Sequence, residues 1–224
     1  MRTTHHDGLL SRRTGWTARA PLLLAGAAAL LGLSSAARAD EPDAATRAHA
    51  QRVAITVCGT CHGASGNSTN PKFPRLAGQN PNYLATQLKA FRAQTRGDPD
   101  AIGYMWGMAG ELDDATIEAL AAYYAGQKAE PSASGASEAI SRGRDIYKNG
   151  VAAQGVPACS SCHGADAHGL QDFPRLAGQH GQYVLKQLGS FQSNMRNVAI
   201  MHGVAQNLNL ADMDAVAAFL ETQP

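Results

Sequence analysis

The sequence has few aromatic residues and no long stretch of one charge. Only 6% of its 224 residues are aromatic, although 44% are hydrophobic. The composition is typical of a folded globular protein, but it supplies few large side chains, so a bound cofactor could provide the missing core volume. From Asp40 to the C-terminus there are 14 basic and 17 acidic residues. This part has no cationic stripe to neutralise phosphates, so we expect no nucleic-acid partner.

The longest apolar run, at 22–33, is short for a membrane span. Arg12 and Arg13 precede it, and an A-x-A sequence ending at Ala39 follows it. This order is typical of a secretory signal peptide. We therefore expect residues 1–39 to be a signal peptide cleaved after Ala39 and the protein to be periplasmic, with an uncleaved N-terminal anchor as the alternative.

The rest of the chain contains an internal repeat. The sequence FPRLAGQ occurs at 73–79 and again at 173–179. The match continues through paired Tyr, Gln, Leu and Phe residues, and such a long period indicates duplication of a whole small domain. A stretch of small and polar residues separates the copies. The expected organisation is an N-terminal domain at 40–130, a linker at 131–137 and a C-terminal domain at 138–224.

Each copy has the pattern of helices and not of strands. Few helix breakers occur at 43–57, and apolar residues at 82–92 follow helical spacing. Asp113 or Asp114 is expected to cap a helix that ends near Gly126, and Asp212 is expected to open the matching helix of the second copy. No alternating β-branched run is long enough for a strand. These patterns predict an all-α fold.

Two motifs, at 58–62 and 159–163, have the pattern C-x-x-C-H. On a helical turn the two cysteines can form thioether bonds to one haem, and the histidine can bind its iron. The motifs predict two covalently bound haem c groups attached at Cys58, Cys61, Cys159 and Cys162, with His62 and His163 as iron ligands. Two disulfides, a Cys₄ zinc site or thioredoxin-like pairs are the alternatives, but none needs a histidine after each pair.

An iron bound by one histidine needs a sixth ligand, and methionine is a soft ligand suited to a c-type haem. The downstream candidates are Met105 and Met108 in the first copy and Met195 and Met201 in the second. Met105 and Met201 are each followed by x-Gly and lie seven residues before an equivalent leucine, so the repeat favours these two. Met108 is the alternative in the first copy.

The repeated block also contains candidates for supporting roles. An iron-bound histidine normally donates its second ring N–H to a backbone carbonyl, and Pro74 and Pro174 would stiffen a loop that presents one. Both prolines could equally be turn residues. Arg75 and Arg175 are candidates to pair with haem propionates, because guanidinium groups match carboxylates. Exposure without a partner is the alternative for both arginines.

These motifs together resemble the cytochrome c4 family of bacterial di-haem class I cytochromes c. The resemblance covers the mature chain: both C-x-x-C-H motifs, the block after each, and the M-x-G segments. It implies two tandem cytochrome c-type domains related by a pseudo-twofold axis, His/Met ligation of both irons, and electron transfer toward terminal oxidases. One departure is Gly143-x-x-x-Tyr147, a helix-contact pattern of such domains that only the second copy contains.

The function that follows is electron transfer in a respiratory chain by a protein that is not an enzyme. With histidine and methionine on each iron, no substrate reaches the metal without loss of a ligand. The expected donor is a cytochrome bc-type complex or a dehydrogenase, the expected acceptor is a terminal oxidase, and any membrane association runs through these partners. The alternatives are a cytochrome subunit of a periplasmic dehydrogenase, for example a flavocytochrome, and a catalytic di-haem enzyme.

Overall fold

The computed structural model describes residues 42–130 and 135–224, all of which belong to one compact unit, Ala39–Pro224. The expected signal peptide, and residues 131–134 of the expected linker, lie outside the described residues. Within the described part, no helix is both long enough and apolar enough to cross a membrane.

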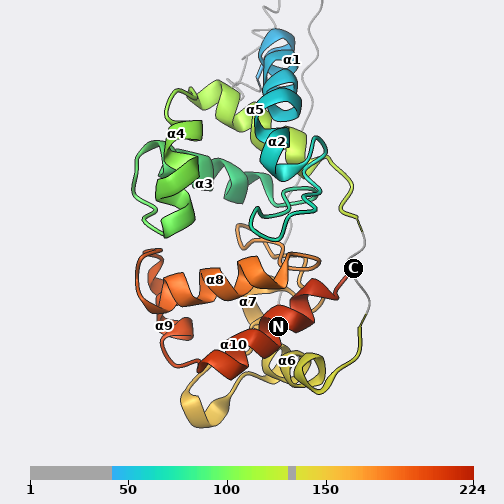
Figure 1. Cartoon of the computed structure of the whole chain (residues 1–224), viewed down its shortest axis with the longest axis vertical. Coiled ribbons are helices and arrows are strands. Elements are labelled where there is room, and N and C mark those ends of the chain that lie inside the picture. Colours follow the sequence, from blue (N-terminus) through green and yellow to red (C-terminus); the bar gives the residue numbers. More distant parts are fainter. Residues whose placement is uncertain (1–41, 131–134) are drawn as a thin grey trace, which may run out of the picture. The chain divides into compact units, whose positions relative to one another are not determined.

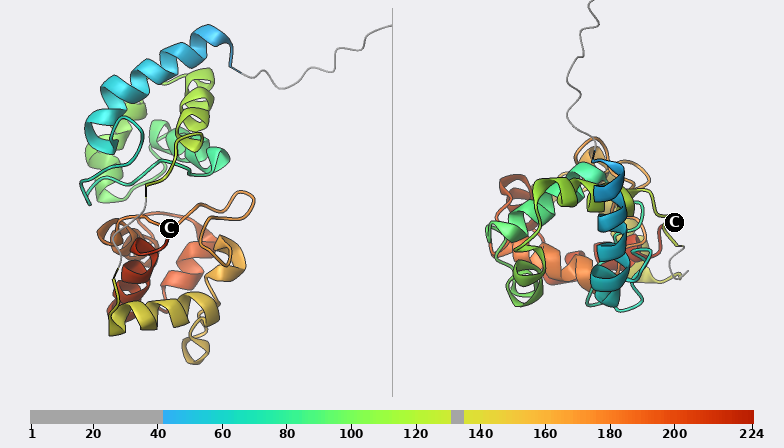
Figure 2. Two further views of the ribbon diagram at one scale, coloured as in Figure 1. Left: turned by 90° about the vertical axis from the view of Figure 1, so that its right-hand side faces the viewer. Right: turned by 90° about the horizontal axis from the view of Figure 1, so that it is seen from above.

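The described residues form helices and loops, with no β-strand and a single isolated bridge between Val151 and Val156. The predicted all-α fold is therefore confirmed. Figure 2 shows that each copy gathers its own helices, blue to green in the first and yellow to red in the second. The helices of the first copy are α1 (Ala44–Val53), η1 (Ala54–Cys58), α2 (Gly59–His62), α3 (Pro81–Arg92), η2 (Ala101–Met105), α4 (Trp106–Ala109) and α5 (Asp114–Ala125). Those of the second are α6 (Glu138–Asn149), η3 (Ala152–Gln154), α7 (Ser160–His163), α8 (Gly181–Gln192), α9 (Ala199–Ala205) and α10 (Leu210–Glu221).

The last helix of each copy begins at an equivalent capping residue. The Asp113 side chain accepts a hydrogen bond of 2.7 Å from the backbone N–H of Thr116 at the start of α5. Asn209 does the same for the N–H of Asp212 in α10, at 2.9 Å. The prediction that Asp212 opens this helix was wrong. Asp212 lies inside the first turn and is fully buried, where its carboxylate accepts a hydrogen bond of 2.7 Å from Arg142 Nε.

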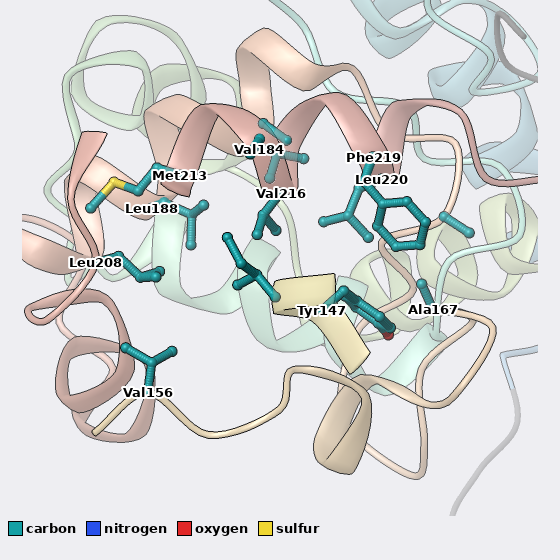
Figure 3. Close-up of a cluster of buried hydrophobic side chains, with 14 residues drawn as sticks. Tyr147, Val156, Ala167, Val184, Leu188, Leu208, Met213, Val216, Phe219 and Leu220 are labelled. Carbon is teal, nitrogen blue, oxygen red and sulfur yellow. The ribbon is translucent and has the colours of Figure 1, made fainter. Parts of the chain in front are cut away.

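In the second copy, α6 packs closely against α10 (Figure 1). The contact is at Gly143, where an added Cβ would lie 1.9 Å from the carbonyl oxygen of Ala215. Tyr147, one turn further, is fully buried in the core cluster of Figure 3, with its ring 5.5 Å from that of Phe219. Its hydroxyl donates to the carbonyl oxygen of Gly164 at 2.5 Å. The Gly-x-x-x-Tyr pattern thus joins the first helix of this copy to the last.

The first copy reaches the same packing with different residues. Its first helix, α1, packs against α5, and Ala50 of α1 and Ala54 of η1 are both completely buried. The tyrosine comes from the opposite helix, because the buried Tyr124 of α5 donates its hydroxyl to the carbonyl oxygen of Ala54 at 3.1 Å. Leu220 occupies the corresponding place in α10, where Tyr147 already fills the space. The buried tyrosine thus comes from the last helix in the first copy and from the first helix in the second. This difference explains why the first copy lacks the Gly-x-x-x-Tyr pattern.

Replacing Gly143 with alanine is expected to destabilise the protein by about 1–3 kcal/mol, because overpacking displaces the backbone of α6 from α10. Gly189 is a matched control in another helix, since a Cβ added there meets no atom within 4 Å. Gly189→Ala should raise stability by up to about 1 kcal/mol, because it restricts the unfolded chain. Denaturant unfolding of both variants measures the difference. Equal free energies of unfolding would contradict the close contact.

Candidate functional site

The first C-x-x-C-H motif lies at the end of a continuous helical segment. Cys58 is the last residue of the π-helix η1, and Cys61 and His62 lie in α2. Gly63 ends the helix at φ 77°, a left-handed conformation that glycine adopts easily. An added Cβ there would also lie 3.0 Å from the carbonyl oxygen of Asn67. The helix therefore stops directly after the histidine, and the chain turns into the loop that carries Pro74.

His62 is buried, and one of its ring nitrogens has a protein partner. Nδ1 lies 2.8 Å from the carbonyl oxygen of Pro74. A carbonyl only accepts, so Nδ1 carries the proton and Nε2 keeps its lone pair. Burial lowers the pKa of His62, although the bond to Pro74 opposes the shift. A neutral imidazole with a free Nε2 is the form that binds iron.

The second motif repeats this geometry. Cys159 precedes α7, and Cys162 and His163 lie within it. The Nδ1 atom of His163 lies 3.1 Å from the carbonyl oxygen of Pro174, and burial lowers the pKa of its ring as well. Gly164 ends the helix at φ 83°. Both histidines are thus oriented by the prolines that the repeat singled out.

The four cysteines form no disulfide with one another, and the described residues contain no group of three or more His, Cys, Asp or Glu side chains able to hold a metal ion. Burial raises the pKa of Cys58, and it raises the pKa of Cys159 to about 11. Redox-active C-x-x-C pairs have the opposite property, a lowered thiol pKa. The surroundings of Cys58 and Cys159 therefore do not favour a thioredoxin-like pair.

The structure separates the candidate methionines by burial. Met105, at the end of η2, is half-buried and packs against the cluster of Phe91, Ala101 and Ala109. Met201, in α9, is half-buried against the core of the second copy. Met108 is 50% exposed and Met195 is 45% exposed. The two methionines selected by the repeat are the ones held in place by packing, and they stay the predicted ligands.

The repeated block has a second role that the sequence analysis missed, because the two copies of the block bind each other. The Oε1 atom of Gln179 accepts from the Arg75 N–H at 2.9 Å, and its Nε2 donates to the Arg75 carbonyl at 2.9 Å. Gln79 makes the same two bonds to the backbone of Arg175, at 2.7 and 2.9 Å. The pairing is reciprocal, as a twofold relation between the copies requires.

The side chains of the two block arginines bond to backbone carbonyls. Arg75 Nη1 donates to Gly178 at 3.2 Å, and Arg175 Nη2 donates to Pro224 at 2.8 Å. The Nε atom of Arg75 is buried and has no hydrogen-bond partner among the described residues, although the side chain as a whole is half-buried. Their pairing with propionates stays a prediction.

His180 adds a pH-sensitive contact between the copies. It is buried, and its Nε2 lies 2.9 Å from the carbonyl oxygen of Ser68. Its Nδ1 lies 3.9 Å from Glu221. Burial lowers the pKa of His180, and the charge of Arg75 lowers it further, while the bond to Ser68 and Glu221 oppose the shift. The folded protein therefore disfavours the protonated imidazole.

The free energy of unfolding is accordingly expected to fall as the pH drops below about 6.5. In that range a histidine of the unfolded chain binds a proton, whereas His180 in the folded protein stays neutral. Asn80 occupies the equivalent place in the first copy, so His180→Asn should reduce the loss between pH 7 and pH 5. Denaturant midpoints across that range measure the effect, with His168→Asn as a control because His168 is 44% exposed. An unchanged pH profile in His180→Asn would contradict the assignment.

Comparison with known proteins gives the same result for both copies. The cytochrome c family profile matches residues 48–127 and 140–224. Cytochrome c4 of Stutzerimonas stutzeri is 39% identical over 190 residues, covering 80% of this chain and 90% of the relative. A thiosulfate dehydrogenase electron acceptor of Thiomonas intermedia is 37% identical over 175 residues, covering 75% and 78%.

A solved structure is also similar. The Acidithiobacillus ferrooxidans cytochrome c4 structure superposes with a TM-score of 0.70 at 40% identity, covering 74% of this chain and 97% of that one. The two family matches agree with the two C-x-x-C-H motifs, each with a buried, carbonyl-bound histidine. The chain therefore belongs to the cytochrome c4 family of di-haem cytochromes c, carries two covalent haem c groups and transfers electrons.

Proposed function

We propose that this chain is a periplasmic carrier that passes electrons through a respiratory chain to a terminal oxidase. The observation that carries the proposal is the same set in each copy: a buried histidine fixed by a proline carbonyl and a half-buried methionine. When bound, each haem iron cycles between the ferrous and ferric states and so carries one electron. Methionine ligation raises the reduction potential, which suits delivery to a high-potential acceptor.

The assigned residues are Cys58, Cys61, Cys159 and Cys162 for attachment, and His62, Met105, His163 and Met201 as axial ligands. The carbonyl oxygens of Pro74 and Pro174 each accept a hydrogen bond from the Nδ1–H of a histidine and so fix the ring plane and the tautomer. The reciprocal bonds of Gln79 and Gln179 tie the two copies together. A fixed relation between the copies keeps the separation of the two haems constant, as an internal electron relay needs.

The alternative is a cytochrome that serves a periplasmic dehydrogenase, and the Thiomonas intermedia relative favours it by name. Both functions need the same haems. Copurification separates them, because a dedicated subunit would be isolated with a second chain, whereas a shuttle would be isolated alone. The direct test is oxidation of the reduced protein by a purified terminal oxidase, followed optically. No oxidation above the rate without oxidase would contradict the proposal.

The reaction with the oxidase is expected to depend only modestly on salt. Residues 40–130 contain 8 basic and 10 acidic side chains, and residues 131–224 contain 6 and 7, so neither copy has a strong net charge. Several of these charges are also paired within the protein, as in Lys89–Glu118 and Arg92–Asp114. Strong electrostatic steering needs a concentrated field. Stopped-flow rates across an ionic-strength series test this, and a hundredfold fall between low and physiological salt would contradict it.

A further inference from the structure

Two arginines at equivalent positions of the repeat, Arg96 and Arg196, are buried together where the copies meet. They are 7% and 5% exposed. Both donate to the same two side-chain oxygens: to Gln87 Oε1 at 2.9 and 2.8 Å, and to Gln187 Oε1 at 2.9 and 2.7 Å. Since each copy contributes one arginine and one glutamine, the arrangement follows the twofold relation of the copies.

Aromatic residues from both copies complete this arginine cluster. Arg96 lies over the ring of Phe91 and Arg196 over that of Phe191, at 4.7 and 4.6 Å from the centroids. The phenol oxygen of Tyr83 accepts from Arg196 at 2.6 Å, and that of Tyr183 accepts from Arg96 at 3.4 Å. The arginine cluster consists of Tyr83, Gln87, Phe91, Arg96, Asp98, Tyr183, Gln187, Phe191 and Arg196.

The two arginines differ in the partner of their Nε atoms, so the twofold symmetry of the cluster is broken there. Arg96 Nε donates to Asp98 Oδ2 at 2.6 Å, and both side chains are almost fully buried. Val198 stands where the repeat would place a second aspartate. Arg196 Nε is buried and has no hydrogen-bond partner among the described residues. The first copy thus supplies a carboxylate to its arginine, and the second copy does not.

The charges of the cluster are unbalanced for the same reason. It holds two guanidinium groups and one carboxylate. The nearby Lys186 is paired with Asp100 and adds no net charge. A buried charge without a partner is costly, and the strongest partner for a guanidinium is a carboxylate. An anion of that chemistry is therefore missing on the side of the second copy, at Arg196 Nε.

We propose that Arg196 binds a propionate of the haem attached at Cys159 and Cys162, in the place that Asp98 takes beside Arg96. Asp98, the one carboxylate of the cluster, is already bonded to Arg96. Arg196 lies five residues before Met201, on the segment that carries the predicted ligand, so the haem of its own copy is a source of a second carboxylate. The proposal rests on the function given above. It makes the environments of the two haems different. The charge of Arg196 acts on the reduction potential of the second haem, whereas the charge of Arg96 in the first copy is already neutralised by Asp98.

Tyr83 offers a competing source of negative charge. Burial opposes ionisation of this phenol, but the guanidinium groups of Arg196 and Arg96 outweigh burial and leave the pKa of Tyr83 below its ordinary value. A tyrosinate would balance the cluster without a propionate. It would not, however, give Arg196 Nε a partner, because Tyr83 is already bonded to the terminal nitrogen.

The test is Val198→Asp, with Val198→Asn as the uncharged control of the same shape. Val198 is 38% exposed, so either side chain can be accommodated. In Val198→Asp the new carboxylate reaches Arg196 as Asp98 reaches Arg96, displaces the propionate and adds negative charge. We expect the potential of the second haem alone to fall in a spectroelectrochemical titration, and the propionate bending band in resonance Raman spectra to shift. Val198→Asn should leave both unchanged.

Arg196→Gln should lower the same potential and make it dependent on pH near neutrality, because the propionate loses the charge that keeps it ionised. Met105→Ala shifts the potential of the first haem, and so shows which of the two potentials belongs to which haem. Equal titrations of Val198→Asp and Val198→Asn would overturn the proposal, as would equal shifts of both haems. A rise of the potential in Tyr83→Phe, without a fall in Val198→Asp, would assign the negative charge to Tyr83. A potential that changes with added acetate would assign the site to a small anion. Two reversible one-electron transitions in the titration of the unaltered protein support the proposed function, whatever the variants show.

Discussion

Replacing both Cys159 and Cys162 with alanine is expected to halve the haem content of the chain. Each C-x-x-C-H motif attaches one haem through two thioether bonds, so losing both sulfurs of one motif removes one covalent group. The other motif belongs to a separate helix bundle with its own core cluster, and it should keep its haem. Intact mass should fall by one haem, and the haem absorbance per chain should fall by about half.

The matched experiment replaces Cys58 and Cys61 and should give the same loss from the other copy. Ser160→Ala is a control within the second motif, because it leaves the cysteines and His163 in place. If either double variant kept two covalent haems, or if one lost both, the assignment of one haem to each motif would be wrong.

Met105→Ala is expected to remove about half of the weak near-infrared charge-transfer band of the ferric protein. A thioether–iron bond gives this band, and each copy is predicted to supply one such bond. The potential of the affected haem should also fall, because a thioether ligand favours ferrous iron. Met105 is half-buried against Phe91 and Ala101, so its sulfur is held by packing.

Met108→Ala provides the control, since this side chain is half exposed and lies one turn away. It should leave the band and both potentials unchanged. Met201→Ala should reproduce the effect of Met105→Ala on the second haem. Loss of half the band in Met108→Ala would instead show that the repeat alignment is wrong around the first M-x-G segment.

The helices could be predicted from patterns that depend on local chemistry, and the iron ligands stay a prediction from the same kind of pattern. Helical spacing placed one helix at 82–92, and the structure has α3 at Pro81–Arg92. An iron-bound histidine needs a carbonyl partner, which points to the proline after each motif, and the two contacts of 2.8 and 3.1 Å are of that kind. Such features are encoded within a few residues or repeated in both copies.

Features that depend on contacts between distant residues could not be predicted in this way. The pairing of Gln79 and Gln179 with the opposite block needs both copies in place. The exchange of the buried tyrosine between Tyr147 in α6 and Tyr124 in α5 preserves the core while it breaks the sequence pattern. Arg196 resembles any surface arginine until its burial is known.

The central claim is that one chain carries two electrons on two covalent haems, and a reductive titration tests it most directly. The oxidised full-length protein is titrated anaerobically with a one-electron reductant, and the reduced haem absorbance is followed to its end point. Consumption of two electrons per chain is the expected result. An end point at one electron per chain, in protein whose mass shows a single covalent haem, would contradict the account.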